Sequence, residues 1–304
     1  MSAPLLATRL AEPIAALARD TRLRALRSPF APGLAIAAAD WHGARPILFA
    51  QAIGTGLDWP AARARALGEI AENLCLHPDA GSGPCPVLSG GQVICTDARA
   101  DPGLGSEGVA VGPDLAAAQR AALCERAERA ALALWWQGRL AAARLSMPPV
   151  LFRLRMGAAA PRQSLLLNLP FIGALHIRLA ISDDGQGGQA AMGSAAAADP
   201  AEADEAALRE MCQAELAWLL PPDHPDCAAR NRQAVTLARR LPALLAAAPA
   251  PAPAGRLPLP DLDALHARGL RVGYADLTHP QLQIAAARFI CPDWPSARDF
   301  LASF

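Results

Sequence analysis

Apolar positions recur along the chain with two different spacings, and the longer spacing predicts helices. In five stretches, small or apolar residues return every three to four positions, as on one face of an amphipathic helix. These stretches are residues 12–28, 58–76, 114–145, 199–220 and 262–268. Asp58 and Asp199 begin two of them, each with a proline within the next two residues, and both are expected to be N-caps.

Shorter apolar runs between turn residues predict strands. Residues 33–54 are expected to form two strands around a His-Gly turn, and residues 183–185, Asp-Asp-Gly, are expected to form another turn. The other predicted strands are residues 164–170, 176–185, 270–277 and 284–291. Because helices and strands recur without regular alternation, we predict an α+β (mixed α/β) fold.

Two segments rich in glycine or proline predict connections. Residues 81–91 are expected to form a loop, and the Pro/Ala-rich residues 246–260 an exposed connection. We expect an N-terminal region of one helix and lead-in strands over residues 1–48. The main domain is then expected over residues 49–304.

Composition excludes several classes of function. In 304 residues, 28 basic side chains balance 28 acidic ones, so no global field favours nucleic acid or an anionic membrane. Every basic residue is arginine, which excludes a lysine-dependent Walker phosphate loop. Neither a signal peptide nor an 18-residue apolar stretch is evident, so we expect a cytoplasmic protein without a membrane span.

Cysteine usage is typical of a reducing compartment. The seven cysteines are an odd number and show no CxxC spacing. His224 and Cys227, in the sequence HPDC, offer two metal-ligand types but fall short of a four-ligand site.

Three predicted helices carry two oxygen-bearing side chains three residues apart, on one helix face. The pairs are Glu69 and Glu72, Glu125 and Glu128, and Glu210 and Gln213. Each pair could mark a solvated helix edge or point inward at a cation, because buried glutamates on facing helices need neutralising. Hard oxygen ligands suit Mg²⁺, which usually accompanies substrate phosphates. The glycine-rich residues 105–112 would let backbone approach a nucleotide.

Four segments around these pairs resemble, in the same order, the motifs of the YcaO-domain family. The segment GSEGVAVGPDLAAAQRAALCERAERAALALWW is similar to the central signature, in which glycine turns precede a helix with Glu-x-x-Glu-Arg-Asp. GTGLDWPAARARALGEIAEN resembles the earlier acidic helix, and GSAAAADPAEADEAALREMCQ the third one. GLRVGYADLTHPQLQIAAARFICPDW resembles the C-terminal strand pair. Together the resemblance covers roughly residues 50–294.

The resemblance implies a single YcaO-like domain of β-sheets packed by long helices, with a nucleotide site between acidic helices. Such proteins use ATP and Mg²⁺ to phosphorylate a peptide-backbone amide oxygen, which allows an azoline, amidine or thioamide to form in a ribosomally made peptide. The residues implied to bind ATP are Ser106, Gly108, Glu125, Arg129, Gln213 and Arg288. The implied Mg²⁺ ligands are Glu69, Glu72, Glu125, Glu128 and Glu210. The resemblance assigns no catalytic residue.

The implied partners are a ribosomally made precursor peptide and a protein that recognises the peptide or delivers sulfur. Family members are often dimeric, so a homodimer is also expected. Neither nucleic acid nor a membrane is an expected partner.

Five positions depart from the family pattern. Asn73 stands in place of an arginine, Glu107 and Pro113 in place of asparagines, Ala117 in place of a frequent acidic ligand, and Ala130 in place of an aspartate. The chain also ends in DFLASF, without the proline-rich terminus of azoline-forming members. Two alternatives therefore stay open. One is a degenerate YcaO protein that binds a peptide or a partner enzyme without ATP turnover, and the other is an unrelated α+β protein.

Overall fold

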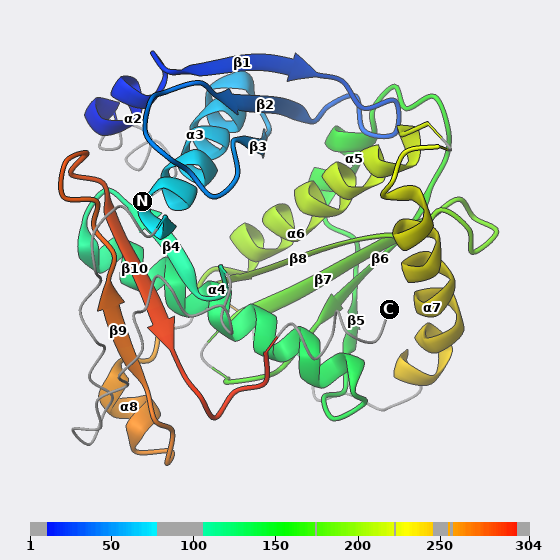
Figure 1. Cartoon of the computed structure of the whole chain (residues 1–304). Helices are drawn as coiled ribbons and strands as arrows, with labels where there is room; N and C mark the ends of the chain where they lie inside the picture. Colours follow the sequence, from blue (N-terminus) through cyan, green and yellow to red (C-terminus); the bar gives the residue numbers. More distant parts are fainter. Residues whose placement is uncertain are drawn as a thin grey trace. The chain divides into compact units, whose positions relative to one another are not determined.

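A computed structural model describes residues 11–77, 106–173, 175–221, 223–245, 255 and 258–296 of the chain (Figure 1). It confirms the predicted mixed α/β fold class. The chain forms two compact units, which are described separately. The first comprises residues 1–26, 35–126 and 260–294, and the second residues 27–34, 127–259 and 295–304. The predicted boundary at residue 48 stays a prediction.

The first unit contains two three-stranded antiparallel sheets, with strand orders β1-β2-β3 and β4-β10-β9. The strands of the first sheet are β1 (Thr21–Leu26), β2 (Ala35–Trp41) and β3 (Gln51–Gly56). The strands of the second sheet are β4 (Val109–Gly112), β9 (Gly273–Asp276) and β10 (Ala285–Ile290). The helices are α2 (Ala11–Leu17), α3 (Trp59–Leu76), the first part of α4 (Leu115–Trp136) and α8 (Leu262–His266).

Helix α3 packs against strands β2 and β3 through small residues. Asp58 is its N-cap, as predicted, and accepts the backbone N–H of Ala61. A Cβ at Gly54 would lie 2.1 Å from the backbone nitrogen of Ala66, so only glycine allows this approach of strand and helix. The buried face of α3, which includes Leu67 and Ile70, then completes a core with the sheet.

The second unit is built on a four-stranded antiparallel sheet of order β5-β6-β7-β8. The strands are β5 (Ala143–Leu145), β6 (Gln163–Asn168), β7 (His176–Asp183) and β8 (Ala191–Ala197). The helices are the second part of α4, α5 (Pro149–Arg155), α6 (Pro200–Ala214), the 3₁₀-helix η2 (Glu215–Leu219) and α7 (Cys227–Leu245). Helix α6, capped by Asp199 as predicted, packs on β7 and β8, where a Cβ at Gly193 would collide with Met211.

Three helix predictions were wrong in extent. The helix expected at 12–28 ends at Leu17, where Thr21 Oγ1 bonds the Leu17 carbonyl, and the alternating residues 21–26 form β1 instead. The helix expected to reach residue 145 ends at Trp136. Gly138 there has φ +73°, and its N–H and that of Arg139 close a Schellman motif. The helix expected at 199–220 tightens into 3₁₀ geometry from residue 215.

The other predicted helices and strands are present near their expected bounds, and the sequence missed β4, β5, α5, β8 and α7. The loop predicted at 81–91 and most of the connection predicted at 246–260 lie outside the described residues. Within the described part of the chain, we find no helix with both the length and the apolar character needed to cross a bilayer.

Candidate functional site

In the first unit, three of the predicted Mg²⁺ ligands interact electrostatically. Burial raises the pKa of Glu72 well above its ordinary value of 4.5, and the negative charges of Glu69 and Glu125 raise it further. The backbone N–H of Val111 donates to Glu72 Oε1 at 3.3 Å and lowers this pKa in part. Such repulsion among carboxylates is what a bound cation would relieve. The i and i+3 spacing therefore gathers acidic charge at this position instead of marking only a solvated edge.

Two predicted nucleotide-binding residues of the first unit are joined by the sheet. Arg288 on β10 stands opposite Val109 on β4, and the Gly108 carbonyl accepts the N–H of Phe289 at 2.8 Å. Gly108 has φ +67°, and a Cβ there would lie 2.7 Å from the Phe289 carbonyl oxygen. Ser106 begins the turn, since its carbonyl accepts the Val109 N–H at 3.2 Å. The pairing of β4 with β10 thus brings the glycine turn next to the strand that carries the buried Arg288.

Arg126 supports this turn and was missed by the sequence interpretation. It is a buried residue that lies between the two glutamates of α4 in sequence. Its Nη2 donates to the carbonyl oxygens of Trp294 at 2.7 Å and Cys291 at 3.2 Å. Its Cβ lies 3.0 Å from the Cβ that Gly108 lacks, and its guanidinium lies 5.9 Å from the Trp294 ring centroid. The sequence cue was an arginine that has Ala122, Leu123 and Ala130 one turn away on its helix.

In the second unit, two other predicted Mg²⁺ ligands meet at one serine. The hydroxyl of Ser194 donates to Glu128 Oε1 at 2.6 Å, and the backbone N–H of Ser194 donates to Glu210 Oε2 at 2.7 Å. Glu128 also has Arg129 beside it, with Nη1 to Oε1 at 3.7 Å. Gln213, half-buried, follows Glu210 by one turn on α6. The contacts therefore join Glu128, Arg129 and Glu210 around Ser194, which lies in the third motif segment but received no role in the sequence interpretation.

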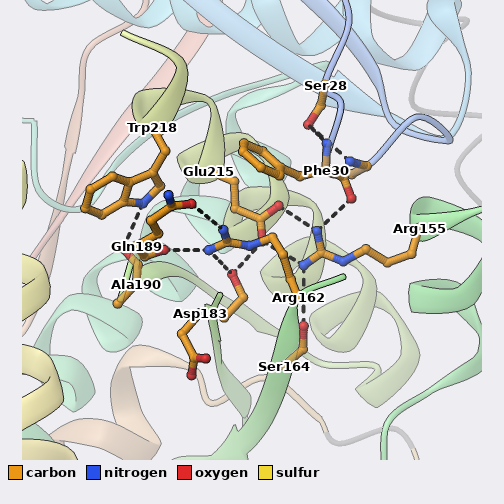
Figure 2. A network of polar contacts seen from close by, with 12 residues as sticks. Ser28, Phe30, Arg155, Arg162, Ser164, Asp183, Gln189, Ala190, Glu215 and Trp218 are labelled. Carbon is orange, nitrogen blue, oxygen red and sulfur yellow. Dashed lines mark hydrogen bonds and ion pairs between the residues drawn. The ribbon is translucent and has the colours of Figure 1, made fainter. Parts of the chain in front are cut away.

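A buried ion-pair network holds the end of α6, directly after Glu210 and Gln213. Figure 2 shows Arg155 and Arg162 directed at Glu215, the first residue of η2. Arg155 forms a bidentate pair with this carboxylate, and Arg162 Nε donates to it at 2.9 Å. The network thus fixes the carboxyl-terminal end of a helix that carries predicted ligands.

The donor set suits Mg²⁺ in chemistry, although it is not a complete ligand cage. Among the residues that the structure describes, no three His, Cys, Asp or Glu side chains are grouped as a ready-made metal site. Mg²⁺ typically needs only one or two carboxylates, since phosphate oxygens and waters complete its octahedron. The raised pKa of Glu72 is the observation that favours a cation at the α3 and α4 carboxylates. The individual ligand assignments stay predictions.

The departures from the family pattern have local structural consequences. The side-chain amide of Asn73 donates to the Glu69 carbonyl at 2.9 Å, within its own helix. Ala117 contributes its backbone N–H to the capping carboxylate of Asp114 at 2.7 Å. Ala130 is fully buried, and a charged side chain is absent there. These positions therefore supply neither the cation nor the carboxylates expected from the pattern.

Among the described residues, the cysteines and histidines form no metal-binding group. Cys227 begins α7 and its thiol contacts the Pro221 carbonyl, while His224 Nδ1 lies 3.6 Å from Asp226. Burial raises the pKa of Cys212 to about 12 and that of Cys291 to about 11, so these thiols stay protonated at neutral pH. All five cysteines in the described residues are free thiols.

Comparison with known proteins gives one family match. The family model described as "YcaO cyclodehydratase, ATP-ad Mg2+-binding" matches residues 93–294. Among curated proteins, no sequence matches the chain.

Several solved structures share the fold. A heterocyclase in complex with substrate and cofactor matches with a TM-score of 0.71 at 17% identity, over 96% of this chain and 53% of its own. This chain thus spans about half the length of that heterocyclase. YcaO from Methanopyrus kandleri, bound with AMPPCP and Mg²⁺, matches with a TM-score of 0.68 at 17% identity, over 98% of this chain and 92% of its own. The E. coli microcin synthetase McbBCD complex with pro-MccB17 bound matches with a TM-score of 0.59 at 14% identity, over 90% and 88% of the two chains. At these identities the likeness shows the fold.

Proposed function

The chain belongs to the YcaO family, and from this premise we propose that it uses ATP and Mg²⁺ to phosphorylate a backbone amide oxygen of a ribosomally made peptide. The γ-phosphoryl group passes to the amide oxygen, and a side-chain or external nucleophile adds to the carbonyl carbon. The oxygen then leaves with the phosphate. An azoline, an amidine or a thioamide is the product, depending on the nucleophile.

The observation that carries this proposal is the strained acidic cluster of the first unit. The pKa of Glu72 on α3 is raised by burial and by the negative charges of Glu69 on α3 and Glu125 on α4. Both helices carry acidic motifs of the family. Glu69 and Glu125 both repel an ionised Glu72 at this partly buried position, and such repulsion does not add to the stability of the fold. A divalent cation with bound phosphates supplies the missing positive charge.

We assign the side chains to two tasks. Glu69, Glu72 and Glu125 in the first unit, and Glu128 and Glu210 in the second, hold Mg²⁺, which supplies neutralisation of phosphate charge when bound. Ser106, Gly108, Glu125, Arg129, Gln213 and Arg288 contact the nucleotide. Guanidinium groups suit this role because they bind phosphate oxygens in a bidentate manner. The chain's contribution is positioning and charge stabilisation, the common strategy of phosphoryl transfer.

The substrate and assembly belong to the same proposal. The substrate is a ribosomally made precursor peptide, and a partner protein recognises it or delivers sulfur. We place the reaction in the cytoplasm and propose a homodimer as the assembly.

A second candidate is a YcaO protein that binds a peptide or partner enzyme without turning over ATP. Asn73 favours it, because its amide is committed to the Glu69 carbonyl where the family pattern has an arginine. Losing one charge-assisted contact weakens binding by about 1.5–3 kcal/mol. The two candidates therefore differ in nucleotide affinity and turnover.

Calorimetric titration with ATP and Mg²⁺ tests the proposal. We expect Mg²⁺-dependent binding that is lost in Glu72→Ala and Glu125→Ala and retained in the control Glu202→Ala, which changes an exposed glutamate on α6. Binding without phosphate release in the presence of precursor peptide would favour the second candidate. An absence of heat at millimolar ATP would exclude the kinase-like mechanism.

A further inference from the structure

We propose that Ser194 is a positioning residue that orients Glu128 and Glu210 for Mg²⁺. This inference rests on the proposed function, since it names how two of the assigned ligands of the second unit are held. Ser194 itself is not among the family-derived ligands, and it reaches both carboxylates from a different element, strand β8.

The geometry gives Ser194 two separate donors for two separate helices. Its hydroxyl donates to Glu128 on α4 at 2.6 Å, and its backbone N–H donates to Glu210 on α6 at 2.7 Å. Because β8 is the last strand in the order β5-β6-β7-β8, this N–H points away from β7 and reaches a side chain instead of another strand. One residue thus couples two acidic helices.

Burial protects these two hydrogen bonds from competition by water. Ser194 is 8% exposed and Glu128 6% exposed, so water competes little for either group. A hydrogen bond at one oxygen restricts the rotation of each carboxylate and so influences how it faces a cation. Hydrogen bonds of this kind to metal-binding side chains change metal affinity by roughly 10–100-fold when removed.

The close packing of Gly193 against α6 holds Ser194 in a defined position. Gly193, immediately before Ser194, lies so close to α6 that a Cβ would be 2.0 Å from the Met211 nitrogen. Strand and helix are therefore in direct contact next to the serine. The Ser194 N–H contributes to Glu210 whatever the side chain, whereas the contact to Glu128 depends on the hydroxyl. Substitution of the side chain consequently separates the two contacts.

The test measures Mn²⁺ affinity by electron paramagnetic resonance, with Mn²⁺ replacing Mg²⁺, in the presence of a non-hydrolysable ATP analogue. We expect Ser194→Ala to weaken Mn²⁺ binding about 10-fold or more. Ser194→Thr, which keeps a hydroxyl, should remain within a few-fold of the wild type. The matched control is Thr236→Ala, which removes a half-buried hydroxyl from α7 of the same unit that donates to the Arg232 carbonyl of its own helix at 2.8 Å, and it should leave the affinity unchanged.

A double-mutant cycle distinguishes positioning from a general loss of structure. If Ser194 acts through Glu128, then Ser194→Ala should have little further effect on Mn²⁺ affinity in a Glu128→Gln background. Full additivity would overturn the assignment, as would unchanged affinity in Ser194→Ala when the wild type binds Mn²⁺. If the wild type binds no Mn²⁺ with the nucleotide, the proposed function itself fails and the role of Ser194 falls with it. Thermal melts of all variants identify any that fail to fold, and Ser194→Thr then carries the comparison.

Discussion

Glu215 and Arg155 form a bidentate ion pair, with both N–O distances at 2.6 Å (Figure 2). Glu215 is fully buried and also accepts from Arg162, whose Nη2 reaches the Gln189 carbonyl at 2.5 Å. Arg155 extends the network to the Phe30 carbonyl at 2.8 Å. One carboxylate therefore joins segments distant in sequence within the second unit, at the point where α6 ends.

We expect Glu215→Gln to lower the free energy of unfolding by about 3–5 kcal/mol, because it leaves two arginines without their shared negative charge. Urea unfolding followed by circular dichroism measures this loss. The control is Asp40→Asn, which breaks the more exposed pair with Arg24 (N–O 3.1 Å) and should cost at most about 1 kcal/mol. Equal losses in the two variants would contradict the assignment of stability to the buried network.

The raised pKa of Glu72 predicts a particular dependence of stability on pH. The folded state keeps a proton on Glu72 at pH values where the unfolded chain, titrating near the ordinary value of 4.5, has already lost it. The contribution of Glu72 to the free energy of unfolding is therefore fully present below pH 4.5. It is lost as the pH rises from 4.5 past the raised pKa of the folded state. We expect thermal melts without Mg²⁺ to show this decline over the pH range above 4.5.

Two comparisons separate Glu72 from other titrating groups. Glu72→Gln should flatten the decline, because the amide cannot ionise. Mg²⁺ should stabilise the wild type more at the upper end of this pH range than at the lower end, and stabilise Glu72→Gln less. A decline that persists unchanged in Glu72→Gln would show that another group causes it.

Gly108 and Gly138 offer a matched test of the turn next to Arg288. Both have positive φ, +67° and +73°, so alanine strains the backbone of either by about 1–2 kcal/mol. A Cβ at Gly108 would also lie 2.7 Å from the Phe289 carbonyl, whereas at Gly138 nothing lies within 4 Å. We expect Gly108→Ala to be the less stable variant in urea unfolding, and to weaken ATP binding while Gly138→Ala does not. Equal effects on binding would argue against a nucleotide contact at this turn.

The sequence predicted those parts of the structure that local patterns determine. Helices α3 and α6 begin after Asp58 and Asp199 because each capping carboxylate satisfies backbone N–H groups of the first turn. The prediction was wrong where the helical and the strand spacing of apolar residues both fit the same segment. Residues 21–26 fit both spacings, and their pairing with β2 makes them a strand.

The parts of the site that the sequence did not predict depend on contacts between distant residues. Ser194 meets Glu128 across 66 positions of sequence, and Arg126 meets Trp294 across 168. A single serine or arginine carries no periodic or spacing signal for such contacts. The acidic pairs were identifiable because their three-residue spacing is local, but the residues that orient them are specified only by the packing of strands against helices.

Asn73→Arg tests whether the departures from the family pattern weaken nucleotide binding. Asn73 is half-buried on α3, one residue after Glu72, and its present contact to the Glu69 carbonyl is a single neutral hydrogen bond of 2.9 Å. Its loss should cost only about 0.5–1.5 kcal/mol, whereas a new charge-assisted contact to phosphate contributes about 1.5–3 kcal/mol. We therefore expect calorimetry to show ATP binding about 10-fold tighter in Asn73→Arg. Asn73→Gln, which adds length without charge, should bind ATP as the wild type does. Tighter binding accompanied by phosphate release would favour an enzyme weakened by this substitution, whereas unchanged affinity would show that Asn73 lies outside the nucleotide site.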